Sequence, residues 1–247
     1  MSIMLSIIII TKNEEKMLPR LLESIKEQGY KEYEVIVSDS NSADNTREIA
    51  KKYGCKIVEG GLPSIGRNNG AKSAKGDILL FLDADVLLPK NFLDKNTEEF
   101  NRKKLVAATT IYLPLSAKFL DKLLFHFYNM LARILQYISP HAAGFCIFCR
   151  KDIFIKIGGF DEKIRFAEDH NLVSKSIRYG KFRLLKGAPL YCDVRRLEKE
   201  GRLRTIIKYL VAGLHRFIKG EIYDPPFSYD MQGVNMKKEN KNSKNSI

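Results

Sequence analysis

Residues 77–85 read DILLFLDAD, an apolar run that ends in two carboxylates, and this stretch decides the fold. The strand expected at Asp77–Asp83 is apolar on both faces, which is typical of a strand buried inside a sheet. Because a buried unpaired charge is costly, Asp83 and Asp85 are expected to face something positive. Two acidic groups at a strand terminus can hold Mg²⁺ or Mn²⁺, which accept carboxylate, water and phosphate oxygens.

Toward the N-terminus, strand-like and helix-like segments alternate. We expect strands at Leu5–Thr11, Tyr33–Asp39 and Cys55–Val58, and helices at Glu14–Gln28, Asp44–Tyr53 and Ser64–Lys75, with a further helix opened by Pro89. Such alternation predicts an α/β fold with a mostly parallel central sheet flanked by helices. Ligands bind at the carboxyl ends of such strands, where the chain places Thr11, Asn13, Glu14, Asp39, Asp83 and Asp85.

Several of these polar residues also have a purely structural interpretation. Asp85 can cap the helix that Pro89 opens. Asp39 can accept hydrogen bonds from a base or ribose, or it can form a turn in Asp-Ser-Asn-Ser. Arg67 and Asn68, near a helix start, suit phosphate oxygens, but they also fit a solvated basic helix.

The second half of the chain is less regular. Strands are expected at Leu105–Leu113 and Gly144–Phe148, with a long helical stretch at Ala117–Ile138. No change of composition separates the halves, so we expect one domain over residues 1–223, with a nucleotide-binding half at about 1–104 and an acceptor-side half at about 105–223. The basic tail, 224–247, is expected to be disordered.

The formal net charge of +13 over 247 residues predicts an acidic partner: nucleic acid, an anionic membrane or a phosphorylated substrate. The four cysteines are too few for a disulfide framework. We expect buried free thiols in a reducing cytosol, with Cys146 and Cys149 on opposite faces of one strand. The N-terminus lacks the features of a signal peptide, and no apolar stretch reaches about 18 residues, so we expect a cytoplasmic protein without a spanning helix.

The ordered motifs of the chain resemble those of family 2 glycosyltransferases with the GT-A fold. They are T-K-N-E-E after the first strand, D-S-N-S-A-D-N-T, G-R-N-N-G-A-K-S-A-K-G-D, L-D-A-D, and G-G-F-D-E followed by A-E-D. The resemblance covers roughly residues 3–220 and includes relatives that act on dolichyl or polyprenyl phosphates. The processive signature Q-x-x-R-W is absent. The resemblance implies inverting transfer of a sugar from a UDP or GDP donor to an acceptor, with Mg²⁺ or Mn²⁺.

The resemblance also implies roles for individual residues. Asp85 is the direct metal ligand, and Asp83 is its partner or a ribose contact. Asp169 is the catalytic base and Glu168 the alternative base, whereas in the structural interpretation both only favour the N-terminus of a helix that runs to Tyr179. The donor nucleotide is expected to contact Thr11, Asn13, Glu14, Asp39, Arg67, Asn68 and Asp83. An acceptor phosphate arrives ionised, and Glu168 and Asp169 would then orient it.

Where processive relatives carry their signature, this chain reads YCDVRRL at residues 191–197. Relatives often place a metal-binding histidine there. Asp193 can substitute for it as a ligand, and Arg195 or Arg196 can clamp a diphosphate.

Residues 202–219 are expected to form an amphipathic basic helix. Its apolar face is Leu203, Ile206, Ile207, Leu210, Val211, Leu214, Phe217 and Ile218. It can lie on an anionic bilayer at the inner face of the membrane and bring the site to a lipid-linked acceptor, or it can pack on the sheet or on a second subunit. Ala117–Ile138 is apolar on more than one face, so it can cover the acceptor groove or touch lipid.

Two other classes of function account for part of the sequence. A basic nucleic-acid-binding protein accounts for the charge, but the chain has no stacking-aromatic platform or recognisable reading motif, so we expect no nucleic-acid partner. A non-catalytic nucleotide-binding module is disfavoured because both Asp83 and Asp85 and the pair Glu168 and Asp169 are present.

Overall fold

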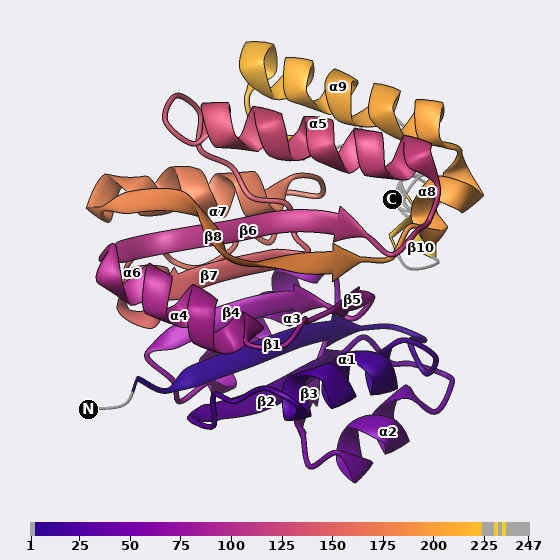
Figure 1. The fold of residues 1–247 in the computed structure, drawn as a ribbon, viewed down its shortest axis with the longest axis vertical. Coiled ribbons are helices and arrows are strands. Elements are labelled where there is room, and N and C mark those ends of the chain that lie inside the picture. Colours follow the sequence, from indigo (N-terminus) through magenta and orange to yellow (C-terminus); the bar gives the residue numbers. More distant parts are fainter. Residues whose placement is uncertain (1–2, 224–229, 232–233, 236–247) are drawn as a thin grey trace, which may run out of the picture.

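A computed structural model describes residues 3–223, 230–231 and 234–235. Its core is an eight-stranded sheet of order β3-β2-β1-β4-β7-β6-β8-β5 (Figure 1). The strands are β1 (Leu5–Thr11), β2 (Tyr33–Asp39), β3 (Lys56–Glu59), β4 (Ile78–Asp83), β5 (Val86–Leu87), β6 (Leu105–Pro114), β7 (Cys146–Arg150) and β8 (Lys181–Cys192). Neighbours pair in parallel except that β7 is antiparallel to β4 and β6, and β5 is antiparallel to β8. The predicted α/β fold with a mostly parallel sheet is confirmed.

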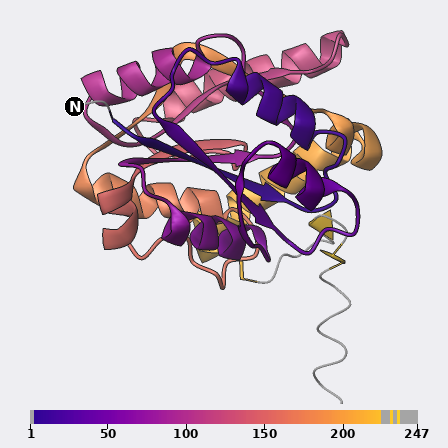
Figure 2. The ribbon, with the colours of Figure 1, turned by 90° about the horizontal axis from the view of Figure 1, so that it is seen from below.

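Helices cover both faces of the sheet (Figure 2). They are α1 (Leu18–Lys26), α2 (Thr46–Lys52), α3 (Pro63–Ser73), α4 (Phe92–Arg102), α5 (Phe119–Leu135), α6 (Lys151–Lys156), α7 (Glu168–Ser176), the 3₁₀ turn η1 (Ile177–Tyr179), α8 (Arg195–Glu200) and α9 (Arg202–Lys219). One core cluster joins the sheet to α1 and α4 and contains Cys146, and a second joins it to α3 and α7 and contains Cys149. The predicted opposite orientation of these free, buried thiols is confirmed.

The segment after Asp83 differs from the sequence expectation. Residues 86–87 form β5, and α4 begins at Phe92 rather than at Pro89. Asn91 adopts the left-handed conformation, with φ 61°, immediately before the helix. The alternative in which Asp85 caps a helix opened by Pro89 is therefore wrong, because a strand follows Asp85 and the helix starts later.

The structure adds β8, a strand that the sequence analysis did not predict. It is twelve residues long and contains Gly187 and Pro189, which are uncommon inside strands. It pairs with β6 on one side and with β5 on the other. This pairing matters for function, because it brings the segment after Cys192 beside the end of β4.

Helices α5 and α9 lie side by side at one end of the molecule, where α5 packs on β6 (Figure 1). The buried carboxylate of Asp121 on α5 pairs with Arg202 at the start of α9, through Nε at 2.6 Å and Nη2 at 3.0 Å. The predicted helix over 202–219 is confirmed. Six residues of the predicted apolar face are exposed, from 43% for Val211 to 71% for Leu203, and Ile206 is half-buried; the exposed six are Leu203, Ile207, Leu210, Val211, Leu214 and Ile218. Packing of this apolar face onto the sheet is thus not what the described residues show.

Among the described residues, no helix is both long and apolar enough to cross a membrane. Most of the segment 224–247, for which disorder was expected, lies outside the described residues. Within it, β9 (Asp230–Met231) and β10 (Val234–Asn235) form a short antiparallel pair.

Candidate active site

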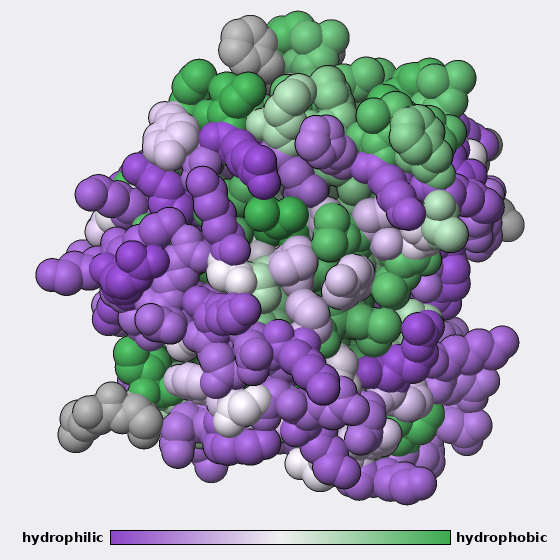
Figure 3. All heavy atoms as spheres, in the orientation of Figure 1, coloured by the Kyte–Doolittle hydropathy of each residue, from purple (hydrophilic) through white to green (hydrophobic). Residues whose placement is uncertain are grey.

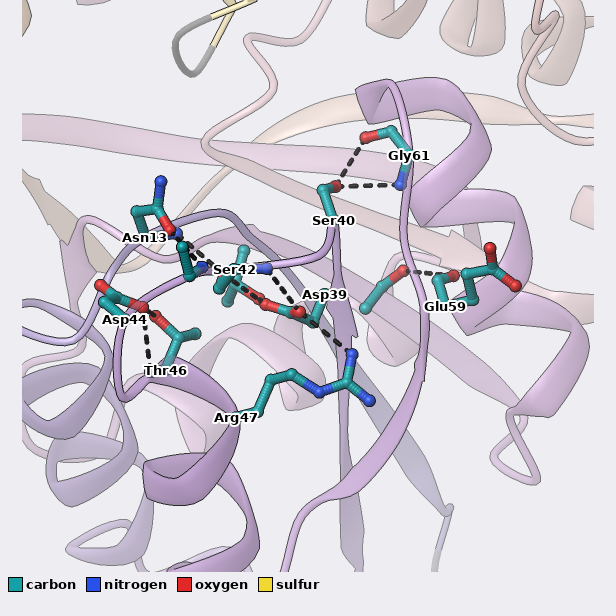
Figure 4. A network of polar contacts seen from close by, with 12 residues as sticks. Asn13, Asp39, Ser40, Ser42, Asp44, Thr46, Arg47, Glu59 and Gly61 are labelled. Atoms are coloured by element: carbon teal, nitrogen blue, oxygen red, sulfur yellow. Dashed lines mark hydrogen bonds and ion pairs between the residues drawn. The ribbon is translucent and has the colours of Figure 1, made fainter.

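Asp39 holds together the loop that follows β2 (Figure 4). Its buried carboxylate accepts hydrogen bonds at Oδ1 from Thr11 Oγ1 at 3.0 Å and from Ser42 Oγ at 2.5 Å. At Oδ2 it accepts the Ser42 N–H at 3.0 Å and pairs with Arg47 Nη1 at 3.2 Å. The turn-forming interpretation of Asp39 is therefore visible in its contacts. The Arg47 side chain is 43% exposed, so it is the partner of Asp39 that a ligand could displace from Oδ2.

The loop after β1 packs against the same turn. Asn13 has φ 55°, in the left-handed region, and its N–H donates to Ser42 Oγ at 2.8 Å while its Oδ1 accepts the Ala43 N–H at 2.8 Å. The Glu14 N–H donates to Thr46 Oγ1 at 2.8 Å. These bonds fix the backbone of residues 13–14 and leave the Glu14 side chain to point elsewhere, to the acidic cluster described next.

An acidic cluster forms where β1, β4 and β8 end. The antiparallel pairing of β5 with β8 is continued by the Asp193 N–H, which donates to the Asp85 carbonyl oxygen at 3.0 Å. Arg195 lies at the rim, with Nε 3.1 Å from Asp193 Oδ1 and Nη2 3.2 Å from Glu14 Oε2. Three segments that are remote in sequence therefore meet here, as the strand-end rule predicts.

The cluster carries more negative charge than its arginines neutralise. The pKa of Asp85 is raised, first by burial and then by the charges of Asp83 and Glu14, although Arg196 and Arg195 oppose the shift. The pKa of Glu14 is also raised, by burial above all; Arg195 lowers it, and Asp193 and Asp83 add smaller upward effects. A divalent cation would relieve this repulsion, so the carboxylates fit the group that the sequence resemblance implies.

In the described part of the chain, no three His, Cys, Asp or Glu side chains converge so as to hold a metal ion by themselves. This arrangement is compatible with Mg²⁺ and similar ions, which are usually bound by one or two carboxylates together with substrate phosphates and water. The three predicted ligands differ in their contacts: Asp83 pairs with an arginine of α3, and Asp193 with Arg195, whereas no side chain donates to the Asp85 carboxylate among the described residues.

Arg67 forms a buried clamp between the two halves of the site. Helix α3 lies close against β1, and a Cβ on Gly70 would overlap the Ile8 side chain. The Arg67 guanidinium pairs through Nη1 with Glu168 Oε1 at 2.6 Å and through Nη2 with Asp83 Oδ1 at 2.9 Å. With a side chain only 3% exposed, Arg67 does not belong to a solvated basic helix, and that alternative is wrong.

Asn68 is likewise committed to a protein contact. Its Nδ2 donates to the Phe160 carbonyl oxygen at 3.0 Å and to Glu162 Oε1 at 2.8 Å, and its Oδ1 accepts the Phe160 N–H at 3.0 Å. The amide thus anchors the G-G-F-D-E loop that leads to Glu168 and Asp169. The predicted contact between Asn68 and the nucleotide-sugar donor would have to compete with these hydrogen bonds.

Glu168 and Asp169 open α7, after Ala167, which has φ 61°. The two carboxylates differ in their surroundings. Glu168 is paired with Arg67, whereas the hydrogen bond to Asp169 comes from the His170 N–H, at 2.8 Å to Oδ1. Burial first, and then the charge of Glu168, raise the pKa of Asp169 to about 7, although Arg67 opposes the shift. A carboxyl with a pKa near neutrality suits general base catalysis.

Gly144 is a site residue that the sequence analysis did not single out. Its carbonyl oxygen accepts a hydrogen bond from Arg67 Nη2 at 3.3 Å, and a Cβ built on it would lie 2.7 Å from that nitrogen. The absence of a side chain at position 144 therefore allows the Arg67 clamp. The only signal in the sequence is a glycine at the start of the apolar run 144–149.

Residues 6–158 match the family model described as Glycosyl transferase family 2. Among curated relatives, the 4,4'-diaponeurosporenoate glycosyltransferase of Staphylococcus haemolyticus is 42% identical over 34% of this chain, a match that spans 24% of that protein's length. An uncharacterized glycosyltransferase of Haemophilus influenzae is 28% identical over 76% of this chain and 68% of its own length.

The solved structures with a similar fold include two glycosyltransferases. The mannosyltransferase from Pyrobaculum calidifontis, in complex with GDP-Man and Mn²⁺, has a TM-score of 0.71 at 21% identity and covers 87% of this chain and 65% of that one. Staphylococcus aureus TarS 1–349, in complex with UDP-GlcNAc, has a TM-score of 0.63 at 21% identity, over 77% of this chain and 58% of that one. The GT-A fold expected from the resemblance is confirmed.

Proposed function

This chain belongs to glycosyl transferase family 2, and from that premise we propose that it is an inverting transferase that moves a sugar from a UDP or GDP donor to an acceptor hydroxyl or phosphate. One observation carries the proposal. Glu14, Asp83, Asp85 and Asp193 gather with Arg195 at the carboxyl ends of β1, β4 and β8. That edge is where ligands bind to open α/β sheets.

The donor side of the site is formed by the first half of the chain. Asp39 and Thr11 suit the nucleoside, since Asp39 Oδ2 can release Arg47 and accept a hydrogen bond from an N–H group of the nucleobase instead. Asp85 and Asp83, with Asp193 beside them, would hold Mg²⁺ or Mn²⁺, and such an ion would supply neutralisation of the diphosphate charge. Arg195 has a half-exposed side chain, so it can turn from its carboxylates to a phosphate, and Arg196 lies near enough to lower the pKa of Asp85.

The acceptor side centres on Asp169. An inverting reaction needs a base opposite the leaving group to take the acceptor proton. The carboxylate of Glu168 is paired with Arg67, which supports Asp169 as that base. Glu168 would then fix the start of α7 and so position Asp169. The two halves, about 1–104 and 105–223, then act as one domain because Arg67 joins Asp83 of the first half to Glu168 of the second.

We place the enzyme at an anionic membrane surface, where its acceptor would be lipid-linked. Exposed apolar side chains are concentrated on α5 and α9, and they form the apolar surface at the top of Figure 3. On α5 they are Phe119, Leu120, Leu123, Phe127, Met130, Leu131 and Ile134, and on α9 Leu203, Ile207, Tyr209, Leu210, Val211, Leu214 and Ile218. A patch of this extent on a chain with net charge +13 fits an anionic bilayer.

The test of the function is turnover of nucleotide sugars. Wild-type protein with Mn²⁺ is expected to hydrolyse or transfer from a UDP- or GDP-sugar, and Asp85→Ala is expected to lose turnover and keep the circular dichroism spectrum of the fold. Near-wild-type turnover in Asp85→Ala would refute the metal role. Salt-sensitive binding to oligonucleotides without any turnover would favour the nucleic-acid alternative instead.

The test of the membrane position is flotation with vesicles of phosphatidylcholine and phosphatidylglycerol at low salt. Leu210→Ser with Leu214→Ser is expected to remove binding, because both side chains are at least 60% exposed on α9. Ile155→Ser on α6 is the matched control, since Ile155 is 67% exposed but lies outside the helix pair. Equal binding by the two variants would contradict the proposed orientation.

A further inference from the structure

A groove lies between α5 and the strands β6 and β8. Its volume is about 470 Å³. The apolar part of its lining includes Ile111 and Leu113 from β6 and Met130 from α5. Exposed apolar side chains are visible in the middle of the same face, below the apolar cap of the helix pair (Figure 3). None of the carboxylates of the acidic cluster lines this groove, so it is separate from the proposed donor site.

The α5 side of the groove also carries basic side chains. Lys122, His126 and Arg133 all project from α5, where their spacing of four and seven residues places them on one side of the helix. All three are exposed. In the part of the chain that the structure describes, none of the three side chains has an ion-pair partner, and none has a side-chain hydrogen bond.

Two other cations of the helix pair are neutralised, whereas Arg204 of α9 has no side-chain partner among the described residues and does not line the groove. Arg202 pairs with Asp121 at 2.6 Å and Lys208 with Glu200 at 2.5 Å. The groove wall therefore differs from the rest of this surface, because its charges face an apolar trough rather than a carboxylate. An anion that carries a hydrocarbon chain can pair with the basic side chains of the groove and contact its apolar side chains at the same time.

We propose that this groove binds the phosphate and the adjoining acyl carbons of an anionic membrane lipid. The proposal rests on the membrane position inferred above and makes it specific. The phosphate lies against Arg133, with Lys122 and His126 continuing the basic wall along α5, and the hydrocarbon passes over Met130 toward the exposed residues of α5. Met130 is 42% exposed and belongs both to the groove and to the apolar surface, so it connects the two. Lipid bound there would hold α5 in one orientation on the bilayer.

The experiment titrates the full chain with dioctanoyl phosphatidate, below its micelle concentration, by isothermal titration calorimetry. Wild-type protein is expected to bind it with a 1:1 stoichiometry. Arg133→Gln is expected to weaken binding about tenfold, because a charged hydrogen bond is lost. Arg204→Gln is the matched control: Arg204 is also exposed and unpartnered among the described residues, but it is on α9 and outside the groove. The affinity of the Arg204→Gln variant for the phosphatidate is expected to stay within about twofold of that of wild type.

Two further ligands separate the sources of the anion. Inorganic phosphate and dioctanoyl glycerol are each expected to bind at least about tenfold more weakly than the phosphatidate. Phosphate lacks the hydrocarbon that contacts the apolar lining, and dioctanoyl glycerol lacks the charge that pairs with the basic side chains. Equal affinity for inorganic phosphate, or an equal effect of Arg133→Gln and Arg204→Gln, would overturn the proposal. Thermal shift with a nucleotide sugar and Mn²⁺, and vesicle flotation, are measured on the same variants. Retained donor binding and flotation with no phosphatidate binding would overturn the groove proposal alone.

Discussion

The Arg67 clamp gives the sharpest prediction about the fold of the site. Arg67→Met keeps an unbranched side chain of similar reach but leaves Glu168 and Asp83 without their counter-ion. Breaking a buried ion pair by removing one partner costs about 3–5 kcal/mol. The Asp83 carboxylate is 28% exposed and water can replace part of its bond, so the lower end applies and we expect a loss of about 3 kcal/mol at pH 8.

The assays are urea unfolding and thermal unfolding, each monitored by circular dichroism at pH 8 and pH 5. For a chain of this length, a loss of about 3 kcal/mol corresponds to a fall in Tm of about 6–12 °C. Carboxyls buried without a counter-ion have raised pKa values, so they take up protons as the pH falls and the penalty shrinks. The loss at pH 5 is therefore expected to be less than half of that at pH 8.

Arg47→Met is the matched control for this prediction. Arg47 also pairs with a buried aspartate, at 3.2 Å, but its side chain is 43% exposed and Asp39 keeps its bonds from Thr11 and Ser42. We expect a loss below about 1 kcal/mol. Equal losses in the two variants at pH 8, or a loss in Arg67→Met that is as large at pH 5 as at pH 8, would refute the clamp.

Other predictions concern the base and its surroundings. Because the pKa of Asp169 is raised to about 7, kcat/KM should rise about tenfold per pH unit below 7 and level off above it; a flat profile from pH 5 to 8 would remove Asp169 from the reaction. The same shift means that the charged carboxylate destabilises the fold, increasingly so as the pH rises from about 4 to about 7, so Asp169→Asn should melt above wild type at pH 8 and equal it near pH 4. Gly144→Ala should cost about 1–3 kcal/mol and lower kcat, since its Cβ would lie 2.7 Å from Arg67 Nη2, whereas Gly213→Ala, with no atom within 4 Å, should be neutral or stabilising in the same unfolding assay.

The strands and helices of the first half were predictable because their signals are local. Continuous apolar runs produced β1, β2 and β4 within a residue of the expected bounds, and helical spacing of Leu18, Leu21, Leu22 and Ile25 produced α1. The strand-end position of Asp83 and Asp85 was also predictable, since carboxylates next to an apolar run need a positive partner, whereas Glu168 and Asp169 were indicated only by the resemblance to family 2 glycosyltransferases.

The pairing of β5 with β8 was not predictable from the sequence. Two residues are too few for a period, and Gly187 with Pro189 reads as a break rather than a strand. Yet this pairing places Asp193 beside Asp85, and it therefore decides which carboxylates belong to the acidic cluster.

The sequence by itself determined the layered α/β fold and the residue types of the site, because apolar periodicity and the cost of burying charge act along the chain. Only the tertiary structure decided which charges are partners. Arg67 pairs with Glu168, 101 positions away, and this pairing is what distinguishes Glu168 from Asp169. Electrostatic pairing depends on distance in space and on burial, and neither quantity is encoded in the spacing of residues.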